Sequence, residues 1–374
     1  MSGPRAGLIV NPVAGLGGAV GLKGSDGADL QARARGLGAV PHAAERADRA
    51  LTRLECRTPD VTIVTAPREL GADVAAAHSL PVDVLPIPVR TGLTTADDTR
   101  AAARGLVSRG VDLILFAGGD GTARDLHDAV GDAVPVLGIP TGVKMHSGAF
   151  ATTPESAGDA AAAFLAAGDA ALTRGGEVVD LDEELDGVIA TRLYGVLRVP
   201  DDRLRVQPMK ASAPSVSDEA ALAAVCASIA DGMDPRRLYL VGPGTTMRRV
   251  LERLGLEKTL LGVDVVRAGR LVAADASEQQ LLELLADEPA TLVVGVVGGQ
   301  GALVGRGNQQ LSPAVIRRIG AENVEIVAGL HKLLTLDPPV LHVDTGDPAL
   351  DEELCGYRRV HVAPGRTLVS KVAA

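Results

Sequence analysis

Aromatic side chains are scarce in this 374-residue chain: tryptophan is absent, and phenylalanine and tyrosine together make up 2% of the residues. Proteins that bind single-stranded nucleic acid usually stack its bases on aromatic rings. Basic residues are also in the minority, 37 against 47 acidic residues, which gives a formal net charge of −10. A duplex-binding protein that neutralises phosphates carries the opposite balance. The composition therefore argues against a nucleic-acid partner.

Cysteines and long apolar runs are few as well. Cys56, Cys226 and Cys355 lie far apart and form no Cys-x-x-Cys pair, so neither a zinc site nor a disulfide framework is indicated and a cytoplasmic location is expected. The apolar run 7–10 is too short for a signal-peptide core. Residues 291–305 are apolar but rich in glycine, and they are shorter than the ~20 residues that a membrane-spanning helix needs. The sequence predicts neither export nor a membrane span.

What remains is the composition of a folded protein, with 46% hydrophobic and 22% charged residues. A chain of this length exceeds what one compact core usually serves, so two domains are expected. The pattern of the chain changes near residue 171. We therefore predict an N-terminal domain of residues 1–171 and a C-terminal domain of residues 172–374, and we leave open that the C-terminal tail returns to the N-terminal domain.

Short apolar runs alternate with helical patterns over the first domain, which is typical of βα units and a mainly parallel sheet. The predicted strands are 7–10, 61–65, 82–87, 111–116 and 135–139, and the predicted helices begin near 28, 95, 122 and 154. After residue 172 the predicted strands are shorter and separated by polar turns, with helices near 217–230, 245–254 and 277–286 and a loop or hairpin excursion over 200–214. The fold class predicted is an α/β domain followed by a β-rich α+β domain.

The sequence Gly118-Gly119-Asp120-Gly121-Thr122 follows one of these strands and precedes a helix. Glycines at a strand end let a ligand approach the backbone, and the helix offers unpaired N–H groups to phosphate. An acid in such a loop can deprotonate an attacking hydroxyl or hold a metal. The alternative is a tight turn whose aspartate caps the helix. No Walker A, dinucleotide-binding, HExxH or GxSxG motif occurs elsewhere in the chain.

Six further segments of the chain follow one another in the order in which similar segments occur in one known protein family. They are residues 7–18, 20–27, 138–145, 241–246, 305–313 and 343–347. Together with GGDGT they resemble the ATP-NAD kinase family, in the superfamily that joins NAD kinases to diacylglycerol kinases, and within it the branch associated with acetoin catabolism. The resemblance covers nearly the whole chain.

This resemblance implies an active site in the crevice between the two domains, with ATP and Mg²⁺ as cofactors and a homo-oligomer as the assembly. Asp120 would be the general base for the ribose 2′-hydroxyl of NAD. Nucleotide and phosphate contacts are expected at Asn11, Gly118, Gly119, Gly121, Thr122, Gly242, Gly244, Thr245 and Thr246. By itself, the segment from Gly242 to Thr246 is also compatible with a strand–loop–helix turn capped by hydroxyls. No motif identifies a protein ligand for the metal.

Acceptor contacts are expected from two further segments. Thr141, Gly142, Lys144 and Met145 follow a strand end; Lys144 is a candidate phosphate-facing cation or a solvated loop lysine, and Met145 a pocket wall or core residue. Gln300, Arg306, Asn308 and Gln309 place amides and a guanidinium among glycines, which suits recognition of a ribose, an amide or a phosphate. A polar β-turn cluster is the alternative for these four residues.

The chain departs from typical NAD kinases in the expected acceptor site. The Asn-Glu pair that contacts the dinucleotide is missing from the comparable region 191–195, and Met247 stands where an aromatic residue is expected. The resemblance as a whole predicts a kinase that phosphorylates NAD to NADP with ATP or polyphosphate, and these departures count against NAD as the acceptor. The alternatives are a kinase of the same superfamily that acts on another small hydroxyl compound, and a nucleotide-binding regulator with weak catalysis.

Overall fold

The computed structural model describes residues 3–18, 20–22, 28–89, 94–142, 145–185, 188–202, 205–206, 216–286, 288–297, 301–305, 307–336 and 338–374. The chain folds into two compact units. The N-terminal unit comprises Met1–Leu16, Gly24–Gln31 and Val40–Met209, and the C-terminal unit comprises Gly17–Lys23, Ala32–Ala39 and Lys210–Ala374.

A five-stranded sheet in the order β3-β2-β1-β4-β5 forms the centre of the N-terminal unit, and every neighbouring pair in it is parallel. Its strands are β1 (Arg5–Val10), β2 (Thr62–Thr65), β3 (Val82–Val84), β4 (Leu113–Gly118) and β5 (Val136–Pro140). All six residues of β4 are buried, as expected of a parallel strand covered on both faces. The predicted parallel α/β class of this domain is confirmed.

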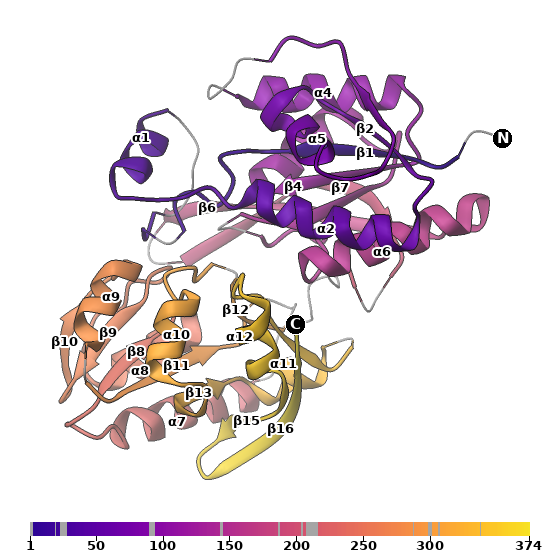
Figure 1. Cartoon of the computed structure of the whole chain (residues 1–374). Helices are drawn as coiled ribbons and strands as arrows, with labels where there is room; N and C mark the ends of the chain where they lie inside the picture. Colours follow the sequence, from indigo (N-terminus) through magenta and orange to yellow (C-terminus); the bar gives the residue numbers. More distant parts are fainter. Residues whose placement is uncertain are drawn as a thin grey trace. The chain divides into compact units, whose positions relative to one another are not determined.

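Helices cover both faces of this sheet (Figure 1). They are α2 (Ala43–Arg57), α3 (Ala72–Ala75), α4 (Ala96–Ser108), α5 (Asp120–Val130) and α6 (Pro154–Ala167). Helix α1 (Ala28–Gly36) is divided between the two units after Gln31. Helices α2 and α6 pack together on one face, and α4 packs on α5 on the other. Helix α2 has no counterpart among the predicted elements, although its buried side chains recur at helical spacing from Ala43 to Leu54.

Local sequence signals determine where several helices begin and end. Thr95 and Asp98 form a capping box at the start of α4, in which the Asp98 carboxylate accepts a hydrogen bond from the Thr95 backbone N–H at 2.8 Å. Thr153 caps α6 ahead of Pro154. Gly110 and Gly131 follow α4 and α5 with positive φ, because the chain must leave each helix in a conformation that glycine tolerates.

A two-stranded antiparallel hairpin follows, made of β6 (Thr173–Leu185) and β7 (Val188–Pro200). Each strand has 13 residues. The hairpin contacts α5, α6 and β5, and it therefore belongs to the N-terminal unit, which extends to residue 209 instead of ending near residue 171. The sequence shows a change of pattern at residue 171, whereas the packing of the hairpin decides to which unit it belongs.

The C-terminal unit contains a mixed nine-stranded sheet in the order β10-β9-β8-β11-β13-β15-β16-β14-β12. The strands are β8 (Leu238–Val241), β9 (Asp264–Arg267), β10 (Arg270–Ala273), β11 (Ala290–Gly295), β12 (Ala302–Val304), β13 (Val324–Val327), β14 (Val340–Val343), β15 (Gly356–Ala363) and β16 (Arg366–Ala373). The final strand pairs with β15 and β14 inside this sheet, so the described C-terminal tail is part of the C-terminal unit. The predicted strand-rich character of this domain is confirmed.

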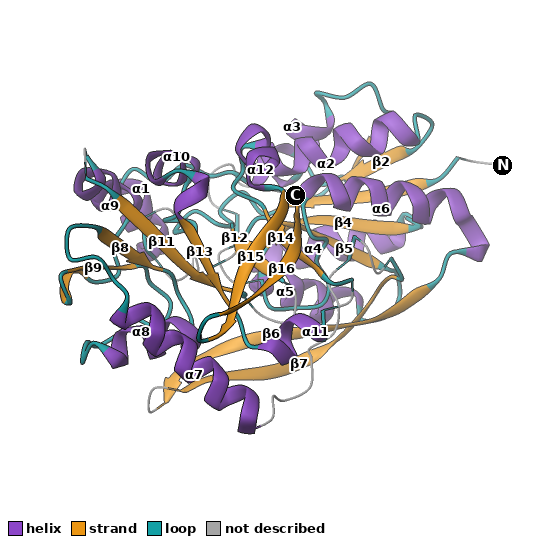
Figure 2. Ribbon diagram, turned by 90° about the horizontal axis from the view of Figure 1, so that it is seen from below, coloured by secondary structure: helices purple, strands orange, loops and turns teal. Residues whose placement is uncertain are grey.

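Six helices are described in the C-terminal unit: α7 (Val216–Asp231), α8 (Thr245–Arg253), α9 (Glu278–Leu285), α10 (Pro313–Ile319), α11 (Leu330–Leu334) and α12 (Pro348–Leu354). One apolar cluster joins α7 and α8 to one face of the sheet, and a second joins α9, α10 and α12 to the other face (Figure 2). No helix in the described part of the chain is long and apolar enough to cross a membrane.

Candidate functional site

The carboxyl ends of β1, β4 and β5 lie side by side at one edge of the N-terminal sheet. From β1 the chain builds the sheet in one direction through β2 and β3, and in the other through β4 and β5. The strand order therefore reverses between β1 and β4, and ligands of open α/β sheets bind outside such a switch point. The loops that begin at Asn11 and Gly118 flank this position.

The GGDGT segment forms a sharper turn than the sequence predicts. Strand β4 continues through Gly118, Gly119 is the N-cap, and α5 begins at Asp120, not near residue 122. A Cβ atom on Gly118 would lie 2.5 Å from the Thr122 side chain, so only glycine allows the helix to start this close to the strand. Gly121 and Thr122 lie in the first turn of α5, where backbone N–H groups have no partner within the helix.

Asp120 is only 3% exposed, and its carboxylate is held by the chain that follows β5. It accepts hydrogen bonds from the His146 backbone N–H at 2.8 Å, and from the Ser147 N–H and Oγ at 3.0 and 2.6 Å. Ser147 Oγ in turn accepts a hydrogen bond from the Val179 N–H of β6 at 3.1 Å. Burial raises the pKa of Asp120, whereas the bonds from His146 and Ser147 oppose that rise.

His146 and Ser147 hold the Asp120 carboxylate, and the sequence alone does not predict this. Two of the three bonds come from backbone groups, which no side-chain pattern reveals. The position of Ser147, seven residues after the end of β5, was the available signal. Parallel strands bring their carboxyl ends to one edge, so a polar side chain after β5 is expected near the end of β4.

Asn11 contacts the same turn from the neighbouring strand. Its Nδ2 donates a hydrogen bond to Thr122 Oγ1 at 3.0 Å, and its Oδ1 accepts one from the Val13 N–H at 3.2 Å. These bonds hold the loop after β1 to the first turn of α5. Thr141 is buried beside them, its N–H donates to the Gly118 carbonyl at 3.2 Å, and its hydroxyl has no hydrogen-bond partner in the described structure. An unsatisfied buried hydroxyl at this edge is available to a ligand.

The Gly15 position gives a direct test of how closely these loops pack. Gly15 has φ of +77°, and a Cβ atom there would lie 2.1 Å from the Thr141 carbonyl oxygen. We expect Gly15→Ala to lower the free energy of unfolding by about 2–4 kcal/mol, because strain and overpacking add. Gly38→Ala is the matched control, since Gly38 has φ of +84° with nothing within 4 Å and should lose only about 1–2 kcal/mol. Equal losses of unfolding free energy for the two variants, measured by urea unfolding, would contradict the close packing at Gly15.

The remaining predicted residues of this segment have different surroundings. Gly142 donates its N–H to the Gly118 carbonyl at 3.1 Å, which keeps it at the GGDGT turn. Met145 is buried in the apolar core of the N-terminal unit, in agreement with the core alternative stated for it. Lys144 lies outside the described residues. The structure therefore brings Asn11, the GGDGT turn, Thr141 and Gly142 together at one edge of the sheet.

In the C-terminal unit, the residues from Gly242 to Thr246 connect β8 to α8. Gly244 has φ of +105° and donates its N–H to the Leu260 carbonyl at 2.7 Å, and Thr245 is the first residue of α8. The Gly242 N–H bonds to the Val293 carbonyl at 2.9 Å, which holds this loop against β11. Thr246 is half-buried beside Gly295. The predicted strand–loop–helix turn is thus present, and nucleotide contact there stays a prediction.

A buried ion pair fixes the loop on which Gly244 depends. Lys258 Nζ lies 3.0 Å from Asp264 Oδ2, and both side chains are fully buried. The Lys258 amine also donates to the Thr259 and Gly262 carbonyls, each at 2.7 Å. Asp264 accepts further bonds from Thr259 and from the Asp275 N–H. An isolated lysine and aspartate six residues apart form no motif, so the sequence does not predict this pair.

The second predicted acceptor segment is only partly described, since Gln300 and Arg306 lie outside the described residues. Asn308 is 1% exposed; its Oδ1 accepts from the Gly305 N–H, and its Nδ2 donates to the Leu303 carbonyl, both at 2.8 Å. Gln309 Nε2 donates to the Gly305 carbonyl at 3.3 Å. The amide of Asn308 therefore holds the turn after β12 together, which corresponds to the β-turn alternative. Acceptor contact by these residues stays a prediction.

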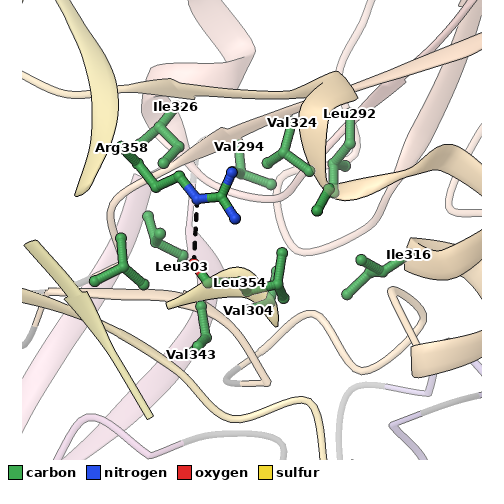
Figure 3. A pocket seen from close by; sticks show the side chains of 12 residues that line it. Leu292, Val294, Leu303, Val304, Ile316, Val324, Ile326, Val343, Leu354 and Arg358 are labelled. Atoms are coloured by element: carbon green, nitrogen blue, oxygen red, sulfur yellow. Dashed lines mark hydrogen bonds between the residues drawn. The ribbon is translucent and has the colours of Figure 1, made fainter. Parts of the chain in front are cut away.

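An apolar hollow in the C-terminal unit lies between the sheet and helices α10 and α12. Its wall includes Leu292, Val294 and Ile326, and the Arg358 side chain lies at its side (Figure 3). The Arg358 guanidinium donates to the carbonyls of Glu353 and Leu354 at the end of α12. The hollow has a volume of about 30 Å³, whereas small-molecule sites have ~300–1,000 Å³. A hollow of this size is too small for a nucleotide.

A protein-held magnesium ion needs oxygen ligands close together, usually from one or two carboxylates. Within the described residues, no three His, Cys, Asp or Glu side chains are grouped so that they could hold a metal ion. Asp120 is the one acid among the residues gathered at the edge of the N-terminal sheet, and its two oxygens already accept three hydrogen bonds. The described side chains therefore do not form a preassembled magnesium site.

The parallel sheet, the GGDGT turn at its switch point and the strand-rich second unit define a two-domain α/β protein with a candidate phosphate-binding turn. The chain belongs to the ATP-NAD kinase family: the model of the ATP-NAD kinase N-terminal domain matches residues 7–170, and that of the C-terminal domain matches residues 236–372. No curated protein and no solved structure matches the chain significantly.

Proposed function

We propose that this protein is a kinase that transfers a phosphoryl group from ATP to the ribose 2′-hydroxyl of NAD. Membership of the ATP-NAD kinase family supports kinase chemistry of this type. The observation that carries the proposal is the position of Asp120, in the first turn of a helix at the switch point of a parallel sheet. A carboxylate beside phosphate-binding N–H groups has a use in hydroxyl activation, whereas a purely phosphate-binding loop gains nothing from a negative charge.

In the proposed mechanism, Asp120 accepts the proton of the acceptor hydroxyl as that oxygen attacks the transferred phosphorus. The raised pKa of Asp120 suits this role, because a general base works best when its pKa approaches the working pH. The hydrogen bonds from His146 and Ser147 hold the carboxylate in one orientation. The backbone N–H groups of Gly121 and Thr122 would face the phosphates of the donor.

Mg²⁺ would be carried by the phosphates of the nucleotide and would neutralise the charge of the transferred group. The Thr141 hydroxyl is the described group best placed to take a new hydrogen bond from a substrate. We propose ATP as the phosphoryl donor, and an assay with ATP and with polyphosphate tests this choice. The crevice between the domains, the homo-oligomer and the cytoplasmic location stay predictions.

A kinase of another small hydroxyl compound is the second candidate, and Met247 favours it. In typical NAD kinases an aromatic residue is expected at this position, but here Met247 is fully buried and packs with Val250 and Leu251 in the core behind α8. Together with the missing Asn-Glu pair, this indicates that the acceptor is recognised differently from NAD in typical enzymes.

The test is an assay of NADP formation with Mg²⁺, NAD and either ATP or polyphosphate, with Asp120→Asn as the inactive control. NADP formed by the natural sequence and not by the variant supports the proposal. Phosphorylation of a different alcohol, with no NADP from either donor, would replace NAD as acceptor and keep the kinase chemistry. Nucleotide binding without turnover of any acceptor would favour a regulatory protein.

A further inference from the structure

Three parallel strands of the C-terminal unit, β8, β11 and β13, end at the same edge of the sheet. The first turn of α8 lies in ordinary van der Waals contact with the strand ends there. A Cβ atom on Gly295 would lie 3.6 Å from Thr246 Cβ and 3.9 Å from the Val327 carbonyl oxygen. The start of α8, the end of β11 and the end of β13 therefore surround one small region.

Lys332, in the helix that follows β13, extends its amine to this region. Its Nζ donates a hydrogen bond to the carbonyl of Val296, the residue after Gly295. No carboxylate of the described residues lies within ion-pair distance of the amine. The neighbouring titratable group on α11 is His331, whose Nε2 is buried without a hydrogen-bond partner in the described structure. Burial lowers the pKa of Lys332 to about 8.

The contrast with Lys258 shows why this arrangement is unusual. Lys258 is fully buried, and Asp264 and two carbonyls satisfy all three of its N–H donors. Lys332 is only partly buried, and it has one described carbonyl partner and no described counter-charge, so part of the cost of removing its charge from water is not recovered. An anion at this edge would recover that cost, since a hydrogen bond to a charged group is stronger than one between neutral groups.

We infer that Lys332 is the cation of a phosphate-binding site at the carboxyl edge of β8, β11 and β13, beside the first turn of α8. Only the identification of the phosphate carrier as a nucleotide rests on the proposed function. The backbone N–H groups of Thr245 and Thr246, at the start of α8, would supply further donors to the same phosphate. The sequence analysis gave Lys332 no role, because it lies outside every recognised motif.

Pyridoxal phosphate is the probe, since it combines an aldehyde with a phosphate. The Lys332 amine would add to the aldehyde and release water to form an imine, and borohydride would then reduce the imine to a stable secondary amine. Peptide mass spectrometry of the full chain then locates the label among six lysines, the others being Lys23, Lys144, Lys210, Lys258 and Lys371. We expect Lys332 to be labelled first, and inorganic phosphate or ATP to protect it.

Pyridoxal without the phosphate is the matched reagent and should label Lys332 at least tenfold less. Equal labelling by both reagents, or no protection by phosphate and ATP, would show a reactive amine without an anion site and would overturn the inference. Neither labelling nor protection requires turnover, so the result does not depend on whether NADP is formed.

Variants give a second, independent readout by calorimetric titration of ATP into the protein. Lys332→Met should weaken ATP binding about ten- to a hundredfold, the range for a lost hydrogen bond to a charged group. Lys332→Arg should retain most of the affinity, whereas Lys371→Met, on an exposed strand, should change nothing. An ATP affinity that survives in the folded Met variant would overturn the inference.

Discussion

Asp120→Asn should lower kcat by about 10²–10⁴-fold, the usual consequence of removing a general base. Asparagine keeps the shape of the side chain but cannot take the proton of the acceptor hydroxyl. The affinity for ATP should change little, because the variant also removes a negative charge near the donor phosphates. Steady-state kinetics with NAD and ATP measure both quantities. Asp128→Asn, on the exposed face of the same helix, is the control and should retain the activity of the natural sequence.

The pH dependence of activity, compared between the natural sequence and Asp120→Asn, distinguishes a general base from a structural residue. Because burial raises the pKa of Asp120, activity should fall on acidification at a pH above the usual ~3.9 of aspartate. The folded state also binds the Asp120 proton more tightly than the unfolded state does. The stability that this proton confers is present at low pH and is lost as the pH rises through the folded pKa. Asp120→Asn should therefore gain stability relative to the natural sequence as the pH rises.

Near-natural turnover in Asp120→Asn would remove this residue from the mechanism. If the variant loses most of its activity but its residual activity still falls at the same acidic pH, another group causes that fall. Either result would leave the family membership intact, because it rests on the match of two domain models.

Asp264→Asn should lower the free energy of unfolding by about 3–5 kcal/mol, because it leaves the buried Lys258 amine without its counter-charge. The loss should also reach the turn before α8, since the Leu260 carbonyl that accepts the Gly244 N–H lies in the loop that Asp264 fixes. Urea unfolding measures the stability. Hydrogen exchange of the Gly244 amide reports the turn, and its protection should fall in the variant.

Two controls make this result specific. Replacing both partners, as Lys258→Met with Asp264→Leu, should recover much of the stability, because no unpaired charge is then buried. Arg253→Gln, which breaks an exposed ion pair with Asp231, should leave the unfolding midpoint almost unchanged. If Asp264→Asn were as mild as Arg253→Gln, the buried pair would have no part in stabilising the loop.

The elements with strong local signals were predictable. Strand β4 is a continuous apolar run, α4 begins at a capping box, and α5 ends at a glycine with positive φ. Such signals act within a few residues, so sequence reasoning finds them. The start of α5 at Asp120 was missed, because it depends on Gly118 allowing Thr122 to pack against the strand end. The assignment of the β6–β7 hairpin was missed because its packing partners, α5, α6 and β5, precede it in the chain.

The sequence by itself determined the parallel α/β class of the first domain, the strand-rich second domain and the GGDGT turn with its acid. These follow from apolar periodicity, glycine placement and residue chemistry, which act over short distances along the chain. Only the tertiary structure decided that His146 and Ser147 hold Asp120, that Asn308 braces its own turn and that Lys332 reaches Val296. The physical reason is the same in each case: the parallel strands and turns bring residues from separate segments together, and their partners are mostly backbone groups. No side-chain pattern in the sequence marks such a partner.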